Sequence, residues 1–333
     1  MSNTNLSSRG SIAGLVFATL SLLLAALLFF NRQYVLDQIT FWQFEPSSQI
    51  QQLAKSSGLN DSGEFYFYAS RPTLEGTQEF NRACDRKEER TAILGCYTGQ
   101  RIYIYDVQDE RLDGIRAVTA AHEMLHAAYE RMGEGERQRI NGLLEKEYAK
   151  LKNDEKLAER MEFYARTEPG QRDNELHSVI GTEISSISPE LEQYYKKYFS
   201  DRSKVVALHA NYEKVFNTLQ ARADDLSAQL RKLRDTIETD TVLYNKDLKS
   251  FNNDAADFKK RADDGDFDSR AQFDRELATL TSRASQLDDF REEIEANIAK
   301  YQSLQKDLMS VASQSEELNR SINSSLAPAP NTL

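Results

Sequence analysis

The residues best suited to chemistry lie in one stretch, VTAAHEMLHAAYERM, which spans residues 118–132 and holds two of the chain's four histidines. His122 and His126 stand four positions apart, and Glu123 directly follows the first histidine. On an α-helix, residues i and i+4 share one face, so both imidazoles can bind the same metal ion. Glu123 points partly aside, where its carboxylate can take a proton from water. The spacing favours a hydrolytic zinc site over an ordinary helix with two structural histidines.

A hydrolytic zinc site needs each of these residue types. Zinc lowers the pKa of water toward neutrality, and a carboxylate takes the remaining proton and delivers it to the leaving amine. A purely structural zinc site uses four protein ligands and has no need of a base beside them. We therefore expect one Zn²⁺ per chain, with Glu123 as the catalytic residue. Tyr164 and Arg166 are candidates for stabilising the oxyanion, and the sequence does not choose between them.

The stretch resembles the active-site helix of the zincin metallopeptidases. Zincins have valine or threonine three positions before the first histidine and an apolar residue after the motif, and Thr119 and Ala127 fit these positions. The zincin type that continues His-x-x-Gly-x-x-His is excluded, because Tyr129 replaces the glycine and Met132 the last histidine. The resemblance covers roughly residues 60–200. It implies a gluzincin-like enzyme of a membrane-anchored bacterial type, whose third zinc ligand is a glutamate from a later helix.

The stretch NELHSVIGTE, residues 174–183, is the best source of that third ligand. It resembles the Asn-Glu-x-x-Ser-Asp signature of one gluzincin group at Asn174, Glu175 and Ser178. Val179 stands where the aspartate of that signature would be, so the usual hydrogen-bond partner of the first histidine is not identified. The resemblance therefore implies Glu175 as the third ligand.

Helical geometry also favours Glu175. At ~100° per residue, Glu175, Ser178 and Thr182 form a polar stripe, so Ser178 and Thr182 are expected to support the metal ligands. Gly181 is expected to let this helix approach the histidine helix closely. The alternatives for the third ligand are Glu183, His177 and, with less support, Glu162.

The segments before and after the histidine motif predict the elements that hold it. EFYFYAS, residues 64–70, is aromatic-rich and predicts a strand, and AILGCYTGQRIYIYDV, residues 92–107, predicts a β-hairpin around a Thr-Gly-Gln turn. The second half of this hairpin, 101–107, is expected to be the edge strand that could bind a peptide by β-augmentation. The pattern is helical over 112–166, breaks at Pro169 and Gly170, and predicts two further helices at 173–186 and 188–199.

An uncharged apolar run from Ser11 to Phe30 opens the chain between Arg9 and Arg32. Twenty helical residues span the ~30 Å hydrocarbon core of a bilayer. A cleaved signal peptide is the alternative, but the small residues of LAA at 24–26 are followed by four more apolar residues. We therefore expect a transmembrane anchor, followed by a juxtamembrane segment over 31–60 with a short helix that begins near Pro46.

The two cysteines, Cys84 and Cys96, lie close together in the sequence. In a chain with a membrane anchor, this spacing predicts a disulfide formed in an oxidising compartment, with two free thiols as the alternative. A loop of about 13 residues would be stabilised by roughly 3 kcal/mol. The main part of the chain is therefore expected to be extracytoplasmic, at the cell membrane.

Residues 204–320 have a different character from the rest of the chain. No proline occurs between Pro189 and Pro328, and apolar residues recur at alternating spacings of three and four. This pattern predicts a coiled coil, and the turn-like ADDGDFDS at 262–269 favours an antiparallel hairpin of two helices. An intermolecular coiled coil is the alternative. The tail 321–333 is expected to be disordered.

Together these features predict a mostly α, α+β chain with a small zincin-like domain over 61–203, a coiled-coil hairpin and one transmembrane helix preceded by a 1–10 tail. The net charge of −11 and the pI near 5.1 argue against a nucleic-acid partner. The predicted function is a membrane-anchored metallopeptidase that acts on peptides or proteins, with a partner or self-association through the coiled coil. The alternatives are a non-catalytic envelope scaffold with a structural or vestigial zinc site, and an amide hydrolase of cell-wall peptide.

Overall fold

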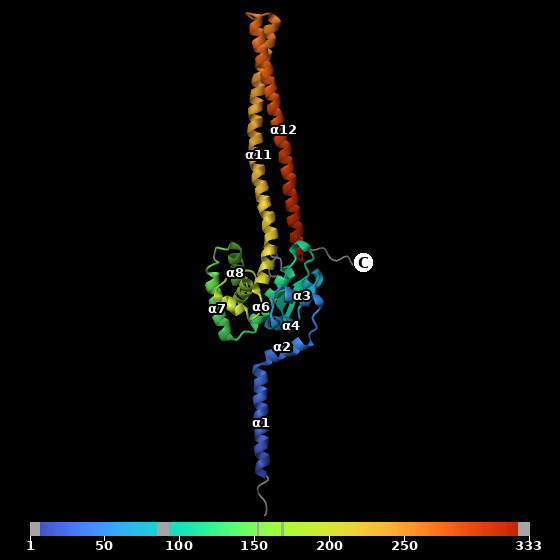
Figure 1. Cartoon of the computed structure of the whole chain (residues 1–333), viewed down its shortest axis with the longest axis vertical. Helices are drawn as coiled ribbons and strands as arrows, with labels where there is room; N and C mark the ends of the chain where they lie inside the picture. Colours follow the sequence, from blue (N-terminus) through green and yellow to red (C-terminus); the bar gives the residue numbers. More distant parts are fainter. Residues whose placement is uncertain (1–6, 85–92, 152, 168–169, 326–333) are drawn as a thin grey trace, which may run out of the picture. The chain divides into compact units, whose positions relative to one another are not determined.

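Figure 1 shows the computed structural model of the chain, which describes residues 7–84, 93–151, 153–167 and 170–325. The chain is mostly helical, with one small three-stranded sheet. It divides into two compact units. One unit comprises residues 1–215 together with 318–333, and the other comprises residues 216–317. The α-dominant α+β class predicted from the sequence is confirmed at this level.

Two helices open the described chain, α1 (Ser7–Phe30) and α2 (Arg32–Gln43), and they meet at Asn31 with a bend of 75°. Among the described residues, no single helix is both long and apolar enough to cross a membrane, although α1 from Gly14 onward and α2 pass that test as a bent pair. Helix α3 (Ser48–Ser56) begins where the sequence indicates, because the Ser47 hydroxyl accepts a hydrogen bond from the Ile50 amide over 3.3 Å.

The segment predicted as a strand at 64–70 is helical instead, and this prediction is wrong. Helix α4 (Asp61–Ala69) begins at Asn60, whose side chain accepts hydrogen bonds from the amides of Ser62 and Gly63 over 3.0 and 3.1 Å. The cap satisfies two of the orphan N–H groups of the first turn. Its local stabilisation, together with burial of Phe67, outweighs the strand preference of the aromatic residues.

The sheet contains β1 (Thr73–Glu75), β2 (Gly95–Thr98) and β3 (Arg101–Tyr105) in the order β1-β3-β2. Strands β2 and β3 are antiparallel, so the predicted hairpin is confirmed for its described residues; residue 92 lies outside them. Strand β1 pairs parallel with β3 and was not expected from the sequence. Strand β3 is therefore central, and the prediction that 101–107 forms the edge strand is wrong. Within the described sheet, β2 is the edge strand on the hairpin side.

Helix α5 (Thr77–Ala83) lies between β1 and β2 in the sequence, and α6 (Ile115–Glu130) follows β3 after a short 3₁₀ turn at Glu110–Leu112. The predicted helical region 112–166 consists of α6, α7 (Glu134–Tyr148) and α8 (Glu155–Thr167). Pro169 lies outside the described residues. The two later predicted helices are confirmed as α9 (Arg172–Thr182) and α10 (Pro189–Tyr195). Helix α6 packs against α3, α4, α9, β2 and β3, so the histidine stretch is the centre of the core.

The second unit is built from two long helices, α11 (Arg202–Asp264) and α12 (Arg270–Ile322), whose ends extend into the first unit. They form an antiparallel hairpin: the Tyr244 and Phe290 rings lie 6.1 Å apart, and Phe258 lies 5.1 Å from Phe273 near the turn. Gly265, with φ +68°, occupies the turn predicted at 262–269. The helical hairpin is therefore confirmed within one chain.

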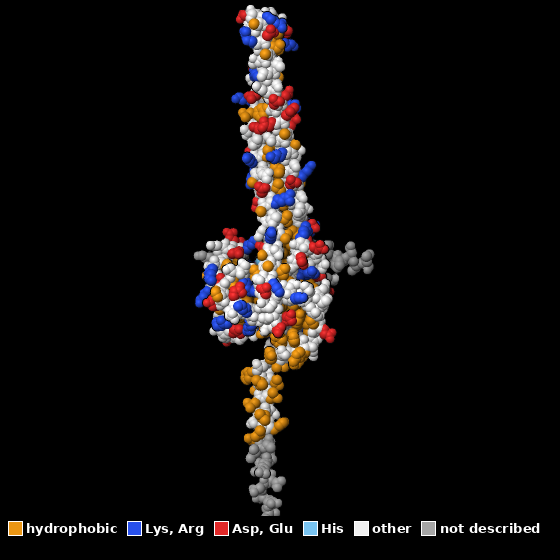
Figure 2. All heavy atoms as spheres, in the orientation of Figure 1, with side chains coloured by type: hydrophobic (Ala, Val, Ile, Leu, Met, Phe, Trp, Pro, Cys, Tyr) orange, Lys and Arg blue, Asp and Glu red, His pale blue; other side chains and the backbone are white. Residues whose placement is uncertain are grey.

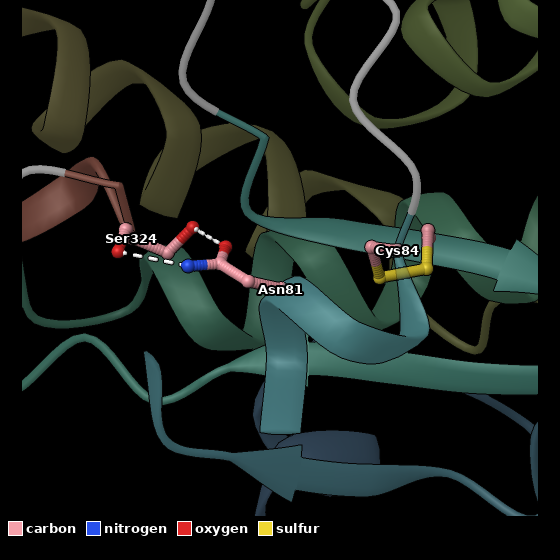
Figure 3. The surroundings of a disulfide bond; sticks show 4 residues. Asn81, Cys84 and Ser324 are labelled. Atoms are coloured by element: carbon pink, nitrogen blue, oxygen red, sulfur yellow. Dashed lines mark hydrogen bonds between the residues drawn. A yellow bond between two sulfur atoms is a disulfide. The ribbon is translucent and has the colours of Figure 1, made fainter. Parts of the chain in front are cut away.

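The end of α12 belongs to the first unit. Ser324 is fully buried, and it exchanges two hydrogen bonds with Asn81 of α5: its hydroxyl bonds Asn81 Oδ1, and Asn81 Nδ2 donates to its carbonyl over 3.1 Å (Figure 3). The expected disordered tail therefore does not begin at 321, because residues 321–325 are ordered. Residues 326–333 lie outside the described part of the chain.

Candidate metal centre

The candidate metal centre lies where α6 crosses α9. Both helices are buried over most of their length, and their close approach depends on a glycine. A Cβ atom on Gly181 would lie 2.4 Å from Leu125 Cδ1 of α6 and 2.8 Å from the Tyr195 ring. The expected role of Gly181 in helix packing is therefore confirmed. This contact brings the beginning of α9 alongside the histidine face of α6.

His122, His126 and Glu175 form a group whose ligand atoms all lie within 4.8 Å of one another. Glu175 Oε2 is 3.6 Å from His122 Nε2 and 3.4 Å from His126 Nε2. Two ligands that each lie about 2.1 Å from one ion at a tetrahedral angle are about 3.4 Å apart. The two distances from Glu175 to the imidazoles match this spacing, whereas the three ligand atoms as a group lie within the wider limit of 4.8 Å. The three residues can hold a metal ion.

Asn174 orients one of these ligands. Its Oδ1 lies 3.0 Å from His126 Nδ1, and its Nδ2 donates to Gln171 Oε1 over 3.1 Å. Because an amide oxygen only accepts, this contact places the imidazole proton on Nδ1 and leaves the Nε2 lone pair directed at the metal position. Asn174 belongs to the Asn-Glu-x-x-Ser signature in the sequence. The sequence does not show that its partner is His126, because this contact depends on the packing of α9 against α6.

Glu123 is buried at 6% exposure next to the group and is not one of its three members. Strand β2 approaches it so closely that a Cβ atom on Gly95 would lie 2.7 Å from Glu123 Oε1 and 2.5 Å from Thr119 Cγ2. Burial raises the pKa of Glu123 above its ordinary value, Glu175 adds to this, and His126 and His122 oppose it. A carboxyl group with a raised pKa is better matched to accepting and returning a proton near neutral pH.

The ligands themselves are tuned in opposite directions. Burial lowers the pKa of His126, but the hydrogen bond to Glu175 and the charges of Glu123 and Glu175 outweigh burial and raise it to about 9. Burial favours the neutral form of Glu175, yet the two histidines hold its pKa well below the ordinary value. The carboxylate is therefore charged without any ion, and a cation would replace the proton that His126 carries.

The two main alternative ligands lie outside this group. His177 is fully buried and its Nε2 lies 2.9 Å from the Tyr194 hydroxyl, and burial together with His126 and His122 lowers its pKa to about 3. Glu183 Oε1 accepts a hydrogen bond from Arg160 over 2.8 Å, and its Oε2 is 3.4 Å from His209 Nε2. Both side chains are thus engaged elsewhere.

The hydroxyls expected to support the ligands bond to their own helix. Ser178 Oγ donates to the Asn174 carbonyl over 3.3 Å, and Thr182 Oγ1 donates to the Ser178 carbonyl over 2.8 Å. Besides Asn174, the side chain of Arg160 in α8 reaches the group, with its Nη1 3.9 Å from Glu175 Oε1. No spacing signal in the sequence links Arg160 to the histidine motif, because the link depends on how α8 packs against α9.

The disulfide between Cys84 and Cys96 is present, with a Cα–Cα distance of 5.9 Å (Figure 3). It joins the end of α5 to β2, one residue after the glycine that contacts Glu123. The free-thiol alternative is therefore excluded by the structure. The covalent link holds the edge strand beside the buried carboxyl group.

No family model, curated protein or solved structure matches this chain. The centre is therefore judged by its own geometry. Two imidazoles, one carboxylate in contact with both, and a second buried carboxyl group beside them make a cation site with a neighbouring proton acceptor.

Proposed function

We propose that this chain is a membrane-anchored, extracytoplasmic zinc metallopeptidase of gluzincin type. The observation that carries the proposal is the convergence of His122, His126 and Glu175, with Glu123 buried beside them and outside the ligand group. Two nitrogens and one carboxylate oxygen are one of the three-ligand donor sets of catalytic zinc sites, which leave one position open. A scaffold protein with a structural ion would not need Glu123 beside its ligands.

The proposed chemistry assigns a role to each residue. Zinc bound to the two histidines and Glu175 would act as a Lewis acid that polarises the peptide carbonyl and lowers the pKa of water. Glu123 takes the proton from the attacking water and returns it to the leaving amine when the C–N bond breaks. Asn174 keeps the His126 lone pair aimed at the metal position, and Arg160 supplies positive charge at the same group.

Strand β2 is the surface that fits an extended substrate. Its outer edge has no strand partner within the described sheet, and its first residue, Gly95, contacts Glu123. A peptide that added to this edge would present its carbonyls in line with the buried carboxyl group. This assigns β2 the role that the sequence suggested for 101–107.

The apolar helix α1 and the disulfide support the proposed location. Side chains on α1 from Leu15 to Phe30 are largely exposed, as expected for a helix surrounded by lipid, and a disulfide persists in an oxidising compartment. The hairpin of α11 and α12 would act as a coiled coil that recruits a protein partner, presents substrate or spaces the domain.

The test uses the full chain purified in detergent without a chelator or metal-affinity tag. We expect about one zinc per chain by elemental analysis, with loss of zinc in Glu175→Ala and retention in the control Glu183→Gln. Cleavage of a peptide library should disappear in Glu123→Gln while zinc and fold persist. Zinc binding without Glu123-dependent cleavage would contradict the peptidase proposal and support the scaffold.

A further inference from the structure

Helix α2 is apolar on two sides, and only one side is packed. On the packed side, the Phe41 ring lies 5.5 Å from Phe65 of α4, and the Phe44 ring lies 6.1 Å from Tyr68. These aromatic contacts hold α2 on the first unit. They also fix which of its faces points away from α4.

A buried ion pair fixes the same orientation. Asp37 is 4% exposed, and Arg131 donates to both of its oxygens, from Nε over 2.8 Å and from Nη2 over 2.9 Å. Arg131 also donates to the Tyr97 hydroxyl over 2.8 Å. A bidentate arginine–carboxylate pair is geometrically specific, so it locks α2 to the end of α6 and to β2. The only acidic residue of α2 therefore lies on the packed side, where it is paired with Arg131.

The opposite face of α2 presents large apolar side chains. Leu36, Ile39 and Trp42 are 45%, 41% and 75% exposed, and they recur at every third position. Residues at this spacing cover an arc of about 120° on a helix. No acidic side chain lies on this arc, and Trp42 is the only tryptophan of the chain. The face is thus a strip of apolar surface without a partner in the described structure.

This strip continues the exposed apolar surface of α1. The two helices are separated by a single residue, Asn31, and Figure 2 shows hydrophobic side chains over the described part of α1 and around α2. When α1 crosses a bilayer near its normal, the 75° bend brings α2 to roughly 15° from the membrane plane. Tryptophan prefers the boundary between headgroups and acyl chains, which is where a helix in this plane would hold Trp42.

We propose that α2 is an interfacial helix that holds the first compact unit, which contains the metal centre, on the lipid bilayer through Leu36, Ile39 and Trp42. This inference rests on the proposed membrane anchoring by α1. The lipid covers the apolar strip. The Asp37–Arg131 pair links α2 to the C-terminal end of α6, the helix that contains His122 and His126. His126 lies five residues from Arg131, about 7.5 Å along the axis of α6. The metal centre would therefore be held close to the membrane surface.

The single tryptophan gives a direct test in the full chain. The protein is reconstituted into phosphatidylcholine vesicles that contain lipids brominated either near the headgroup or deep in the acyl chains. We expect Trp42 emission to be blue-shifted and quenched about twofold more by the shallow bromines than by the deep ones. In Ile39→Asp, quenching should fall to background while vesicle flotation through α1 persists. The matched control Gln49→Asp, which adds the same charge at an exposed position of α3, should retain the quenching.

Each outcome separates the proposals. A chain that floats with the vesicles but keeps Trp42 in water overturns the interfacial role of α2 and leaves the anchor intact. Blue-shifted emission without lipid quenching also overturns it, because a protein surface would then cover the strip. A chain that does not float overturns both the anchor and α2. Zinc content and library cleavage, measured on the same preparation, report on the peptidase proposal independently.

Discussion

The contact between Asn174 and His126 predicts how strongly a residue that is not itself a metal ligand affects the affinity for the metal. Asn174→Ala removes the amide oxygen that lies 3.0 Å from His126 Nδ1, on a side chain that is 4% exposed. Loss of such a partner weakens metal binding by about 10–100-fold, which corresponds to roughly 1.4–2.7 kcal/mol. Burial makes replacement by solvent ineffective, so we expect the upper part of this range.

The measurement is a competition titration of the metal-free chain with zinc against a chromophoric chelator, with circular dichroism as the check on folding. Two variants serve as controls. Asn174→Asp keeps an oxygen acceptor and should bind zinc at least as well as the wild type. Ser178→Ala removes a buried hydroxyl that donates only to its own helix and should leave the affinity unchanged. The reasoning is refuted if Asn174→Ala binds zinc within about twofold of the wild type.

Three further predictions concern the same region. Gly95→Ala should lower kcat about 100-fold with zinc retained, because the new Cβ lies 2.7 Å from Glu123 Oε1 and displaces the carboxylate; unchanged kcat in peptide assays would contradict this. Since the pKa of His126 is raised to about 9 in the metal-free chain, zinc must displace a proton, so apparent affinity should fall about tenfold per unit as pH decreases from 8 to 7; a flat titration series would oppose it. Paired Cys84→Ser and Cys96→Ser substitutions should lower the free energy of unfolding by up to about 3 kcal/mol in urea titrations, and equal stability would exclude a structural role.

The sequence predicted the elements whose signals are local. The i, i+4 histidines require only a helix, and α6 provides it. The Thr-Gly-Gln turn between two apolar runs predicts the hairpin of β2 and β3, and the heptad pattern predicts two long helices joined by a turn within 262–269, where Gly265 lies. In each case neighbours within a few positions determine the outcome, so one sequence suffices.

The errors arise where distant segments determine the outcome. The aromatic run at 64–70 has strand propensity, but it is helical because Phe67 is buried in the core and because Asn60, which caps the helix, donates a hydrogen bond to the distant Lys196 carbonyl. Strand β1 is only three residues long and pairs parallel with β3, which moves β3 to the centre and leaves β2 at the edge. The contacts of Asn174 and Arg160 depend on the packing of α9 against α6 and α8. The hydrophobic periodicity of the sequence does not predict this packing.

The chain enters the second unit at residue 216 and returns to the first unit at residue 318, where Ser324 is bonded to Asn81. The hairpin is thus an insertion that is connected to the first unit by two chain segments, rather than a C-terminal extension that is connected by one. An insertion of this kind can change length without disturbing its host, provided that both helices lose or gain the same number of heptads, about 10.5 Å each. Truncation at the turn behaves differently, because it also removes the last segment of the host's own core.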